Sequence, residues 1–371
     1  MSISKKSFYA AAAVAVMSIS TASFAQVKFD DLSFADAQKQ AAKENKLIMI
    51  DYYTDWCKWC HVLDQRTYID REVGKFANEH FVNLKINAEK GEGIALAKSN
   101  KIQGYPTIAF YDSKGKEVDR VVGFQDAEKF LRSLKAVKEG GISAVLTKVQ
   151  KSDNPEHWLI AANYHAEKQD LASANTAYDK VIALDKSETK ALKAEATYMK
   201  AFIMPEGADQ IAMLKAALEA YPDRSEARQA TIVVVKHELK TSPDDAVARS
   251  EKWAIKNPDD FDFFNMIAWE LALANTHLGK AEDFANMAVD ARGASPQDRA
   301  NALDTKAEIM HRGGRPDYAV VFSKQAIGML DANKDKKQLK ELQTNLAKYE
   351  QALAAMPESE RKQLIPTRSQ R

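Results

Sequence analysis

The sequence is poor in cysteine, in long apolar runs and in charge of one sign. Its 371 residues include two cysteines, which stand three positions apart. A disulfide between them would close almost no loop, so the pair is not a long-range covalent staple. The 53 basic and 52 acidic residues nearly cancel, which argues against a surface made for nucleic acid or anionic lipid. After residue 25, no run approaches the roughly 18 apolar residues of a transmembrane helix.

The first 25 residues have the pattern of a secretory signal peptide. Lys5 and Lys6 precede a short apolar run at 8–19, and Ser23 and Ala25 supply the small residues of a cleavage site. We therefore expect a mature periplasmic chain that does not insert into a membrane. Without Lys5 and Lys6, 51 basic residues face 52 acidic ones, and we expect no nucleic-acid partner.

The composition of the chain changes near residue 140. Residues 46–122 alternate β-rich runs with helical stretches, whereas the chain beyond Gly141 is rich in Ala, Leu, Lys and Glu. Alternating strands and helices predict an α/β layer structure. We expect a signal peptide at 1–25, an α/β domain at 26–140, a linker at 141–153, helical repeats with a capping helix at 154–356, and a polar tail at 357–371.

In the first domain, the near-continuous apolar run 47–53 is typical of a central strand that is buried on both faces. Ser33, Asp70 and Asp126 each precede an amphipathic stretch, where a short polar side chain favours a helix start. We expect helices at 33–45, 57–65, 70–79, 94–99 and 126–139, and strands at 47–53, 81–86, 107–111 and 118–122.

The second domain has a repeat. Pro222, Pro258 and Pro296 are 36 and 38 residues apart, close to the roughly 34-residue period of helix–turn–helix repeats. The first unit resembles a tetratricopeptide repeat, because Trp158, Tyr164, Ala174 and Tyr178 match its pattern; residues 187–258 match loosely. Such solenoids bind proteins on a concave face. We expect a protein partner or a second copy of the chain there, with a simple spacer as the alternative.

The two cysteines fall at a predicted strand–helix junction. Cys57 stands at the start of the helix, where unpaired backbone N–H groups and the helix dipole favour a thiolate. Such positions lower a cysteine pKa from about 8.5 to roughly 3.5–7.5, and Lys58 adds a cation. We expect Cys57 to be the exposed nucleophile and Cys60, nearly one turn further, to be the resolving thiol that releases a mixed disulfide.

Residues 48–60, which end in Trp56-Cys57-Lys58-Trp59-Cys60, resemble the active-site strand, turn and helix of the thioredoxin family. Tyr105-Pro106-Thr107 resembles the cis-proline loop of that family, and Gly123 matches the glycine after its last strand. The stretch 30–138 resembles exported thioredoxin-like proteins and the C-terminal periplasmic domain of the DsbD-type reductase. The predicted fold is thus an α/β thioredoxin fold followed by an all-α, tetratricopeptide-like solenoid.

The resemblance also implies roles for residues outside the cysteine pair. Asp51 matches the buried aspartate that takes the proton of the resolving cysteine, and Lys85 matches the lysine that partners it. A cis Pro106 would present the backbone of Tyr105 to an extended substrate segment, and two tryptophans would wall the site. The expected substrate-binding residues are Trp56, Trp59, Tyr105 and Pro106.

Taken together, these features predict an exported thiol–disulfide oxidoreductase that reduces protein disulfides with electrons from a membrane or periplasmic donor, and that has no metal or cofactor. The Lys58-Trp59 dipeptide departs from the common Gly-Pro of the family, so oxidase and isomerase activities stay open. A redox-sensitive binding adaptor is the alternative from another class. Less favoured alternatives are copper handling and a c-type haem site, since His61 completes the C-x-x-C-H pattern.

Overall fold

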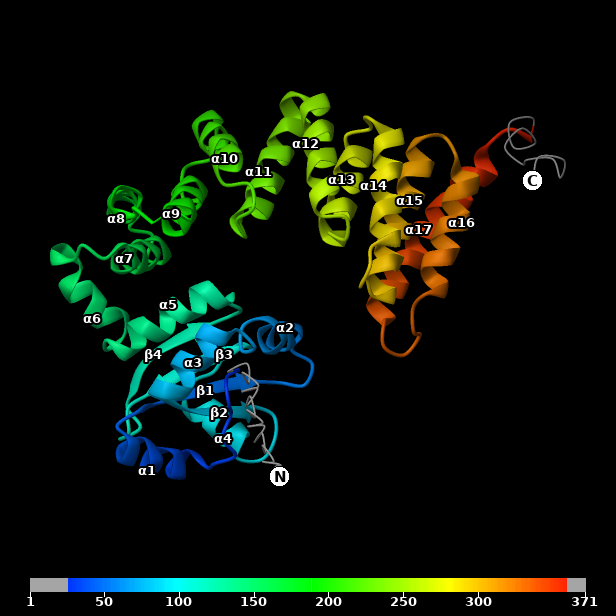
Figure 1. Ribbon diagram of the computed structural model, residues 1–371. Helices are drawn as coiled ribbons and strands as arrows, with labels where there is room; N and C mark the ends of the chain where they lie inside the picture. The colour runs from blue at the N-terminus through cyan, green and yellow to red at the C-terminus, as the bar shows by residue number, and fades with distance from the viewer. Residues whose placement is uncertain (1–25, 188, 359–371) are drawn as a thin grey trace, which may run out of the picture. The chain divides into compact units, whose positions relative to one another are not determined.

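The computed structural model describes residues 26–187 and 189–358 (Figure 1). The predicted signal peptide and residues 359–371 of the predicted tail lie outside the described residues. Internal contacts divide the chain into two compact units, one that ends at Tyr164 and one that begins at His165. Among the described residues, no helix combines the length and the apolarity that a bilayer crossing requires.

The first unit is built on a four-stranded sheet with the order β2-β1-β3-β4. The central strand β1 (Leu47–Tyr53) pairs parallel with β2 (Phe81–Asn87) and antiparallel with β3 (Thr107–Tyr111), and β4 (Glu117–Val122) pairs antiparallel with β3. Five of the seven residues of β1 are fully buried. The α/β layer structure that the alternating pattern predicts is therefore confirmed.

Helices cover both faces of this sheet, because successive side chains of β1 point to opposite sides. Ile48, Ile50 and Tyr52 pack in one cluster with α1 and α4. Met49 packs in another, with Leu63 of α2 and with residues of α3 and α5. The helices are α1 (Phe34–Glu44), α2 (Lys58–Arg66), α3 (Arg71–His80), α4 (Glu92–Ser99) and α5 (Ala127–Lys138).

Three helix starts lie where the sequence predicts them. The side chain of Ser33 accepts a hydrogen bond from the Asp36 amide at the start of α1. Asp70 and Asp126 cap α3 and α5 in the same way. The segment 141–153, which the sequence analysis assigns to a linker, forms α6 (Gly141–Lys148) and a short 3-10 helix (Val149–Lys151).

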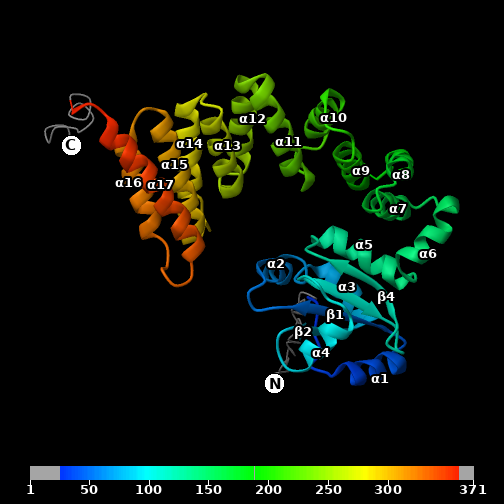
Figure 2. The same cartoon turned by 180° about the vertical axis from the view of Figure 1, so that it is seen from behind.

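In the described residues after the first unit, every regular element is a helix. Helix α7 (Pro155–Glu167) spans the point where the two units meet in the sequence. From α8 onward neighbouring helices pack against one another, as the repeat pattern predicts, with α12 and α13 joined through their side chains. Helix α17 packs on α16, where a terminal capping helix is expected (Figure 2). The helices are α8 (Leu171–Leu184), α9 (Ala191–Phe202), α10 (Ala208–Ala220), α11 (Glu226–Thr241), α12 (Pro243–Lys256), α13 (Phe261–Leu273), α14 (Leu278–Asp290), α15 (Pro296–Arg312), α16 (Pro316–Gly328) and α17 (Lys336–Ala355).

Helix α2 is held on the sheet by few apolar groups, since Cys60 and Leu63 are its buried residues. Replacing Leu63 with Ala should therefore lower the free energy of unfolding of the first unit by about 2–5 kcal/mol, through lost burial and a cavity. Urea titration followed by the NMR amide signals of β1 measures this change. Gln65→Ala, an exposed position on the same helix, is the control, and equal losses in the two variants would refute the packing role of Leu63.

Candidate thiol–disulfide site

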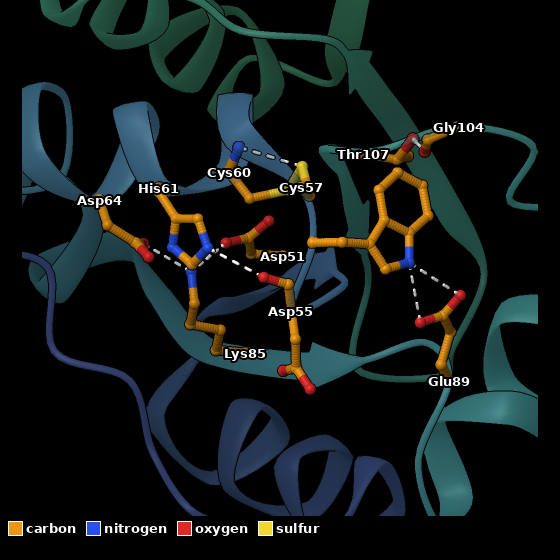
Figure 3. The surroundings of a disulfide bond; sticks show 11 residues. Asp51, Asp55, Cys57, Cys60, His61, Asp64, Lys85, Glu89, Gly104 and Thr107 are labelled. Atoms are coloured by element: carbon orange, nitrogen blue, oxygen red, sulfur yellow. Dashed lines mark hydrogen bonds and ion pairs between the residues drawn. A yellow bond between two sulfur atoms is a disulfide. The ribbon is translucent and has the colours of Figure 1, made fainter. Parts of the chain in front are cut away.

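Cys57 and Cys60 form a disulfide at the N-terminus of α2 (Figure 3). The chain leaves β1 at Tyr53, turns through three residues and enters the helix with Cys57 as the N-cap residue. The Cys60 amide donates to Sγ of Cys57 at 3.1 Å. The N-cap sulfur therefore takes the place of the oxygen that usually satisfies a free amide of the first helical turn.

This position suits a thiolate once the disulfide is reduced. A negative sulfur would keep the Cys60 amide as its donor and would lie at the positive end of the α2 dipole. The predicted exposure of Cys57 is wrong for the disulfide form, because Cys57 is 4% exposed and Cys60 is 1% exposed. The reason is that the bond and the capping contact both draw the Cys57 sulfur onto the helix end.

Asp51 and Lys85 come together below the cysteine helix. They are paired in register on the parallel strands β1 and β2, so both side chains point to the face of the sheet that α2 covers. Nζ of Lys85 lies 2.7 Å from Oδ2 of Asp51, and Asp51 is fully buried. The structure thus brings together the two residues that the thioredoxin resemblance places beside the resolving cysteine.

Asp64 is a third member of this group, and the sequence analysis missed it. Its Oδ1 lies 2.6 Å from Nζ of Lys85, and its side chain is 39% exposed. The available signal was the spacing, since Asp64 follows Cys60 by four residues and lies on the same side of α2. Asp64 therefore links the buried Asp51–Lys85 pair to solvent.

Burial dominates the charge balance of the group. It raises the pKa of Asp51 above its ordinary value, and the neighbouring charge of Lys85 offsets only part of this effect. For Lys85, burial opposes the charged form, but Asp51 and Asp64 together raise the pKa. Asp51 is thus a carboxyl of raised proton affinity next to a lysine that stays protonated, which suits a group that must take a proton.

An aromatic cage surrounds the Lys85 ammonium. Its Nζ lies 5.3 Å from the ring centre of Phe29, 5.0 Å from that of Tyr53 and 5.4 Å from that of Tyr68. A cation over aromatic faces is attracted to them. The cage holds Lys85 between the two carboxylates, and no local sequence pattern identifies it, because its rings come from separate parts of the chain.

The surface beside the disulfide is aromatic. Trp56 is 68% exposed and Trp59 is 55% exposed, so neither ring is part of the core. The Trp56 ring meets Tyr105 edge-on with centres 5.9 Å apart, and Trp59 lies 5.6 Å from Phe124. Phe124 extends the expected set of surface residues. Exposed rings of this size are typical of contact surfaces.

Hydrogen bonds tie the turn before Cys57 to the segment after β2. The indole N–H of Trp56 donates to both carboxylate oxygens of Glu89, at 3.1 and 3.0 Å. Asp55 accepts from Asn87 at 2.9 Å and pairs with Lys90 at 2.6 Å. These partners are more than 30 residues away from the turn, so sequence reasoning did not find them. They fix the turn that presents the first cysteine.

The Tyr105–Pro106 peptide is cis, as the resemblance implies. The Pro106 carbonyl accepts from the Gly123 amide at 2.8 Å, and Oγ1 of Thr107 donates to the Gly104 carbonyl at 2.8 Å. Gly123 has a φ of +86°, a left-handed conformation that glycine adopts without a Cβ clash. The loop is therefore anchored at both ends where β3 begins.

His61 points away from the pair. Its Nε2 lies 3.1 Å from the Asp55 carbonyl oxygen (Figure 3). That contact gives the imidazole a local structural partner on the active-site turn.

Comparison with known proteins agrees with this geometry. Residues 34–138 match a family described as a thioredoxin-like domain. The chain contains a thioredoxin-like domain. That domain is related to the thiol:disulfide interchange protein DsbD of Escherichia coli K12, with 34% identity over 114 residues, or 29% of this chain and 20% of that protein. The chain thus spans about a fifth of the length of this curated relative.

Two solved structures give further likenesses. The DsbD C-terminal domain of Neisseria meningitidis, in reduced form, is 30% identical, with a TM-score of 0.24 over 27% of this chain and 90% of that one. PilW, a type IV pilus biogenesis factor, is 13% identical, with a TM-score of 0.37 over 59% of this chain and 99% of that one. The family match and the DsbD relative show that the thioredoxin-like domain, with its Cys57–Cys60 pair, is homologous to thiol:disulfide interchange domains.

The raised pKa of Asp51 makes the stability of this domain depend on pH. Because the folded carboxyl binds a proton more tightly than the unfolded one, whose reference value is 3.8, the free energy of unfolding should fall as the pH rises from about 4 toward the folded pKa. Asp51→Asn should remove this fall. The free energy of unfolding of the variant minus that of the parent protein should therefore increase with pH.

Urea titrations of the reduced protein between about pH 4 and 8, followed by the NMR amide signals of β1, measure the difference. Asp153→Asn, at an exposed position, is the control and should follow the parent curve. If the free energy of unfolding of Asp51→Asn minus that of the parent stays constant or falls with pH, burial does not raise the pKa of Asp51 as inferred.

Proposed function

We propose that the protein is an exported, periplasmic thiol–disulfide oxidoreductase that reduces protein disulfides through Cys57 and Cys60. The observation that carries the proposal is the capped sulfur of Cys57 at the end of α2, above a buried Asp51 that is paired with Lys85. This arrangement supplies a stabilised leaving and attacking sulfur together with a proton acceptor for the second thiol. The proposed catalytic residues are Cys57, Cys60, Asp51 and Lys85.

In the first step the Cys57 thiolate attacks one sulfur of a substrate disulfide. A mixed disulfide forms between Cys57 and the substrate, and the other substrate sulfur leaves as a thiolate. In the second step Cys60 gives its proton to Asp51 and attacks Sγ of Cys57. The second substrate thiolate leaves, and the Cys57–Cys60 disulfide results. Two electrons have then passed to the substrate, and a dithiol donor must restore the reduced pair.

The aromatic surface is the proposed binding site for the substrate chain. Trp56, Trp59, Tyr105 and Pro106 flank the disulfide, and two of their rings are more than half exposed. An extended substrate segment would pair with the backbone at Tyr105 and cover these rings. Folded or unfolded protein segments gain more from such a surface than a small disulfide does.

The helical region is the proposed partner-binding part. A groove of about 750 Å³ opens between α9, α10 and α11. Its wall combines apolar groups, among them Phe202 and Val233, with Lys236 and Lys240 on one face of α11. Grooves between stacked helix pairs suit extended polypeptide segments. We propose that a protein partner docks there, which would bring a substrate or an electron donor to the thioredoxin-like domain.

The reductase assignment predicts that the protein catalyses the reduction of insulin by dithiothreitol. Cys57→Ser should reduce this turnover by at least about 100-fold, because the attacking thiolate is lost. Insulin precipitation measures the rate. Ser113→Ala, in the β3–β4 turn, is the control for handling and folding. Full turnover by Cys57→Ser would refute the mechanism.

Cys60→Ser separates the enzyme from the adaptor alternative. Without the resolving thiol, an enzyme accumulates mixed disulfides between Cys57 and several exported proteins. An adaptor would capture one stable partner whether or not Cys57 is present. The double variant Cys57→Ser/Cys60→Ser is therefore the matched control, and capture by it of the same single partner would favour the adaptor.

The proposed substrate surface predicts a selective effect of Trp59→Ala. Loss of a stacked aromatic contact should raise KM for insulin by roughly 2- to 10-fold. The KM for oxidised glutathione should change less, because a small disulfide covers little of the surface. Steady-state kinetics with both substrates test this expectation, with Tyr111→Phe in the buried core as a control. Equal increases for both disulfides would contradict a binding role for the ring.

A further inference from the structure

Tyr68 is a buried titratable residue that the proposed mechanism does not use. It lies two residues after the end of α2 and is 3% exposed. Its ring packs edge-on against Phe29 at 5.1 Å and against Phe130 at 5.7 Å. A phenylalanine ring would fill the same space, so packing alone does not require a hydroxyl at this position. A buried hydroxyl without a hydrogen bond costs free energy.

The hydroxyl of Tyr68 and one oxygen of Asp51 are complementary. Oδ2 of Asp51 is taken by Lys85, whereas Oδ1 and the Tyr68 hydroxyl are both buried and make no hydrogen bond of ordinary geometry within residues 26–187 and 189–358. Both residues lie beside the same ammonium: Nζ of Lys85 is 2.7 Å from Oδ2 of Asp51 and 5.4 Å from the centre of the Tyr68 ring. The Tyr68 hydroxyl, a donor that lacks an acceptor, thus lies in the same buried group as Oδ1 of Asp51, an acceptor that lacks a donor.

The charges of this group keep Tyr68 a donor. Burial first, and then the negative charges of Asp51 and Asp64, raise the pKa of the Tyr68 phenol well above its usual range. The titratable side chains that act on it are Asp51 on β1, Asp64 on α2 and Lys85 on β2. Tyr53 of β1 contacts the same Lys85 ammonium. The phenol therefore keeps its proton over the pH range in which a thiol–disulfide exchange protein works.

We propose that Tyr68 is a positioning residue for proton transfer at Asp51: its hydroxyl donates to Oδ1 when the carboxylate is ionised, and so holds Asp51 in the form that accepts the proton of Cys60. The inference rests on the proposed function and deepens it. Lys85 holds one oxygen of the base and Tyr68 the other. Tyr68 is assigned no direct role toward sulfur or substrate, so in this proposal it acts through Asp51.

Tyr68→Phe tests the proposal, because it removes the hydroxyl and keeps the ring. The full-length reduced protein is mixed with an aromatic disulfide that releases a coloured thiolate. Attack by Cys57 releases the first thiolate and leaves an aryl mixed disulfide. Cys60 then loses its proton to Asp51 and displaces the second thiolate as the Cys57–Cys60 bond forms. Stopped-flow absorbance separates the two phases.

In Tyr68→Phe, the pH midpoint of the rate of the second phase should shift, and that of the first phase should not. Loss of a hydrogen bond to a charged group raises the pKa of Asp51, so the midpoint of the second phase should move up by about one pH unit in Tyr68→Phe. In an Asp51→Asn background, Tyr68→Phe should cause no further shift. Tyr111→Phe, which removes a buried hydroxyl 3.5 Å from that of Tyr52 in the cluster on the other face of the sheet, is the matched control.

Two results would overturn the proposal. One is a second-phase profile of Tyr68→Phe that overlays that of the parent protein. The other is an equal shift in Tyr111→Phe or in the Asp51→Asn background, since a purely structural role would act without Asp51. Failure of the parent protein to reduce insulin would instead remove the proposed function, and the two coloured phases would still report on Tyr68.

Discussion

The register between β1 and β2 is the constraint on which the site depends. Parallel pairing of Asp51 with Lys85 puts a carboxylate and an ammonium side by side on the face that α2 covers. Taking these charges out of water is costly unless they are paired, and the pair persists because Asp64 and three aromatic rings complete its surroundings. A slip of β2 by one residue would turn Lys85 to the opposite face of the sheet, away from Asp51.

The site also depends on the position of Cys57 between β1 and α2. Cys57 ends the turn from β1 and begins α2, so the same strand that carries Asp51 also positions the capped sulfur. One short stretch therefore positions both the proposed attacking sulfur and the proposed base for the second thiol. In the proposed mechanism the α2 dipole stabilises the thiolate of Cys57, and the raised proton affinity of Asp51 serves Cys60.

The sequence predicted the parts of this site that local patterns encode. The apolar run of β1, the caps at Ser33, Asp70 and Asp126, and the position of Cys57 at a helix start all follow from neighbouring residues. The contacts of Glu89, Asn87 and Lys90 with the turn did not, because they join segments that only the folded sheet brings together. The loose repeat match at 187–258 likewise concealed helices that pair like the others.

The bond between Trp56 and Glu89 has a consequence for recognition. Because the indole N–H of Trp56 already donates to Glu89, the side chain presents the apolar part of its ring to a binding partner. A bound polypeptide whose carbonyl accepted from this N–H would displace Glu89 and remove one of the hydrogen bonds that hold the turn before Cys57. Because Trp56 directly precedes Cys57, a partner that contacts the Trp56 ring also contacts the turn that positions the Cys57 sulfur.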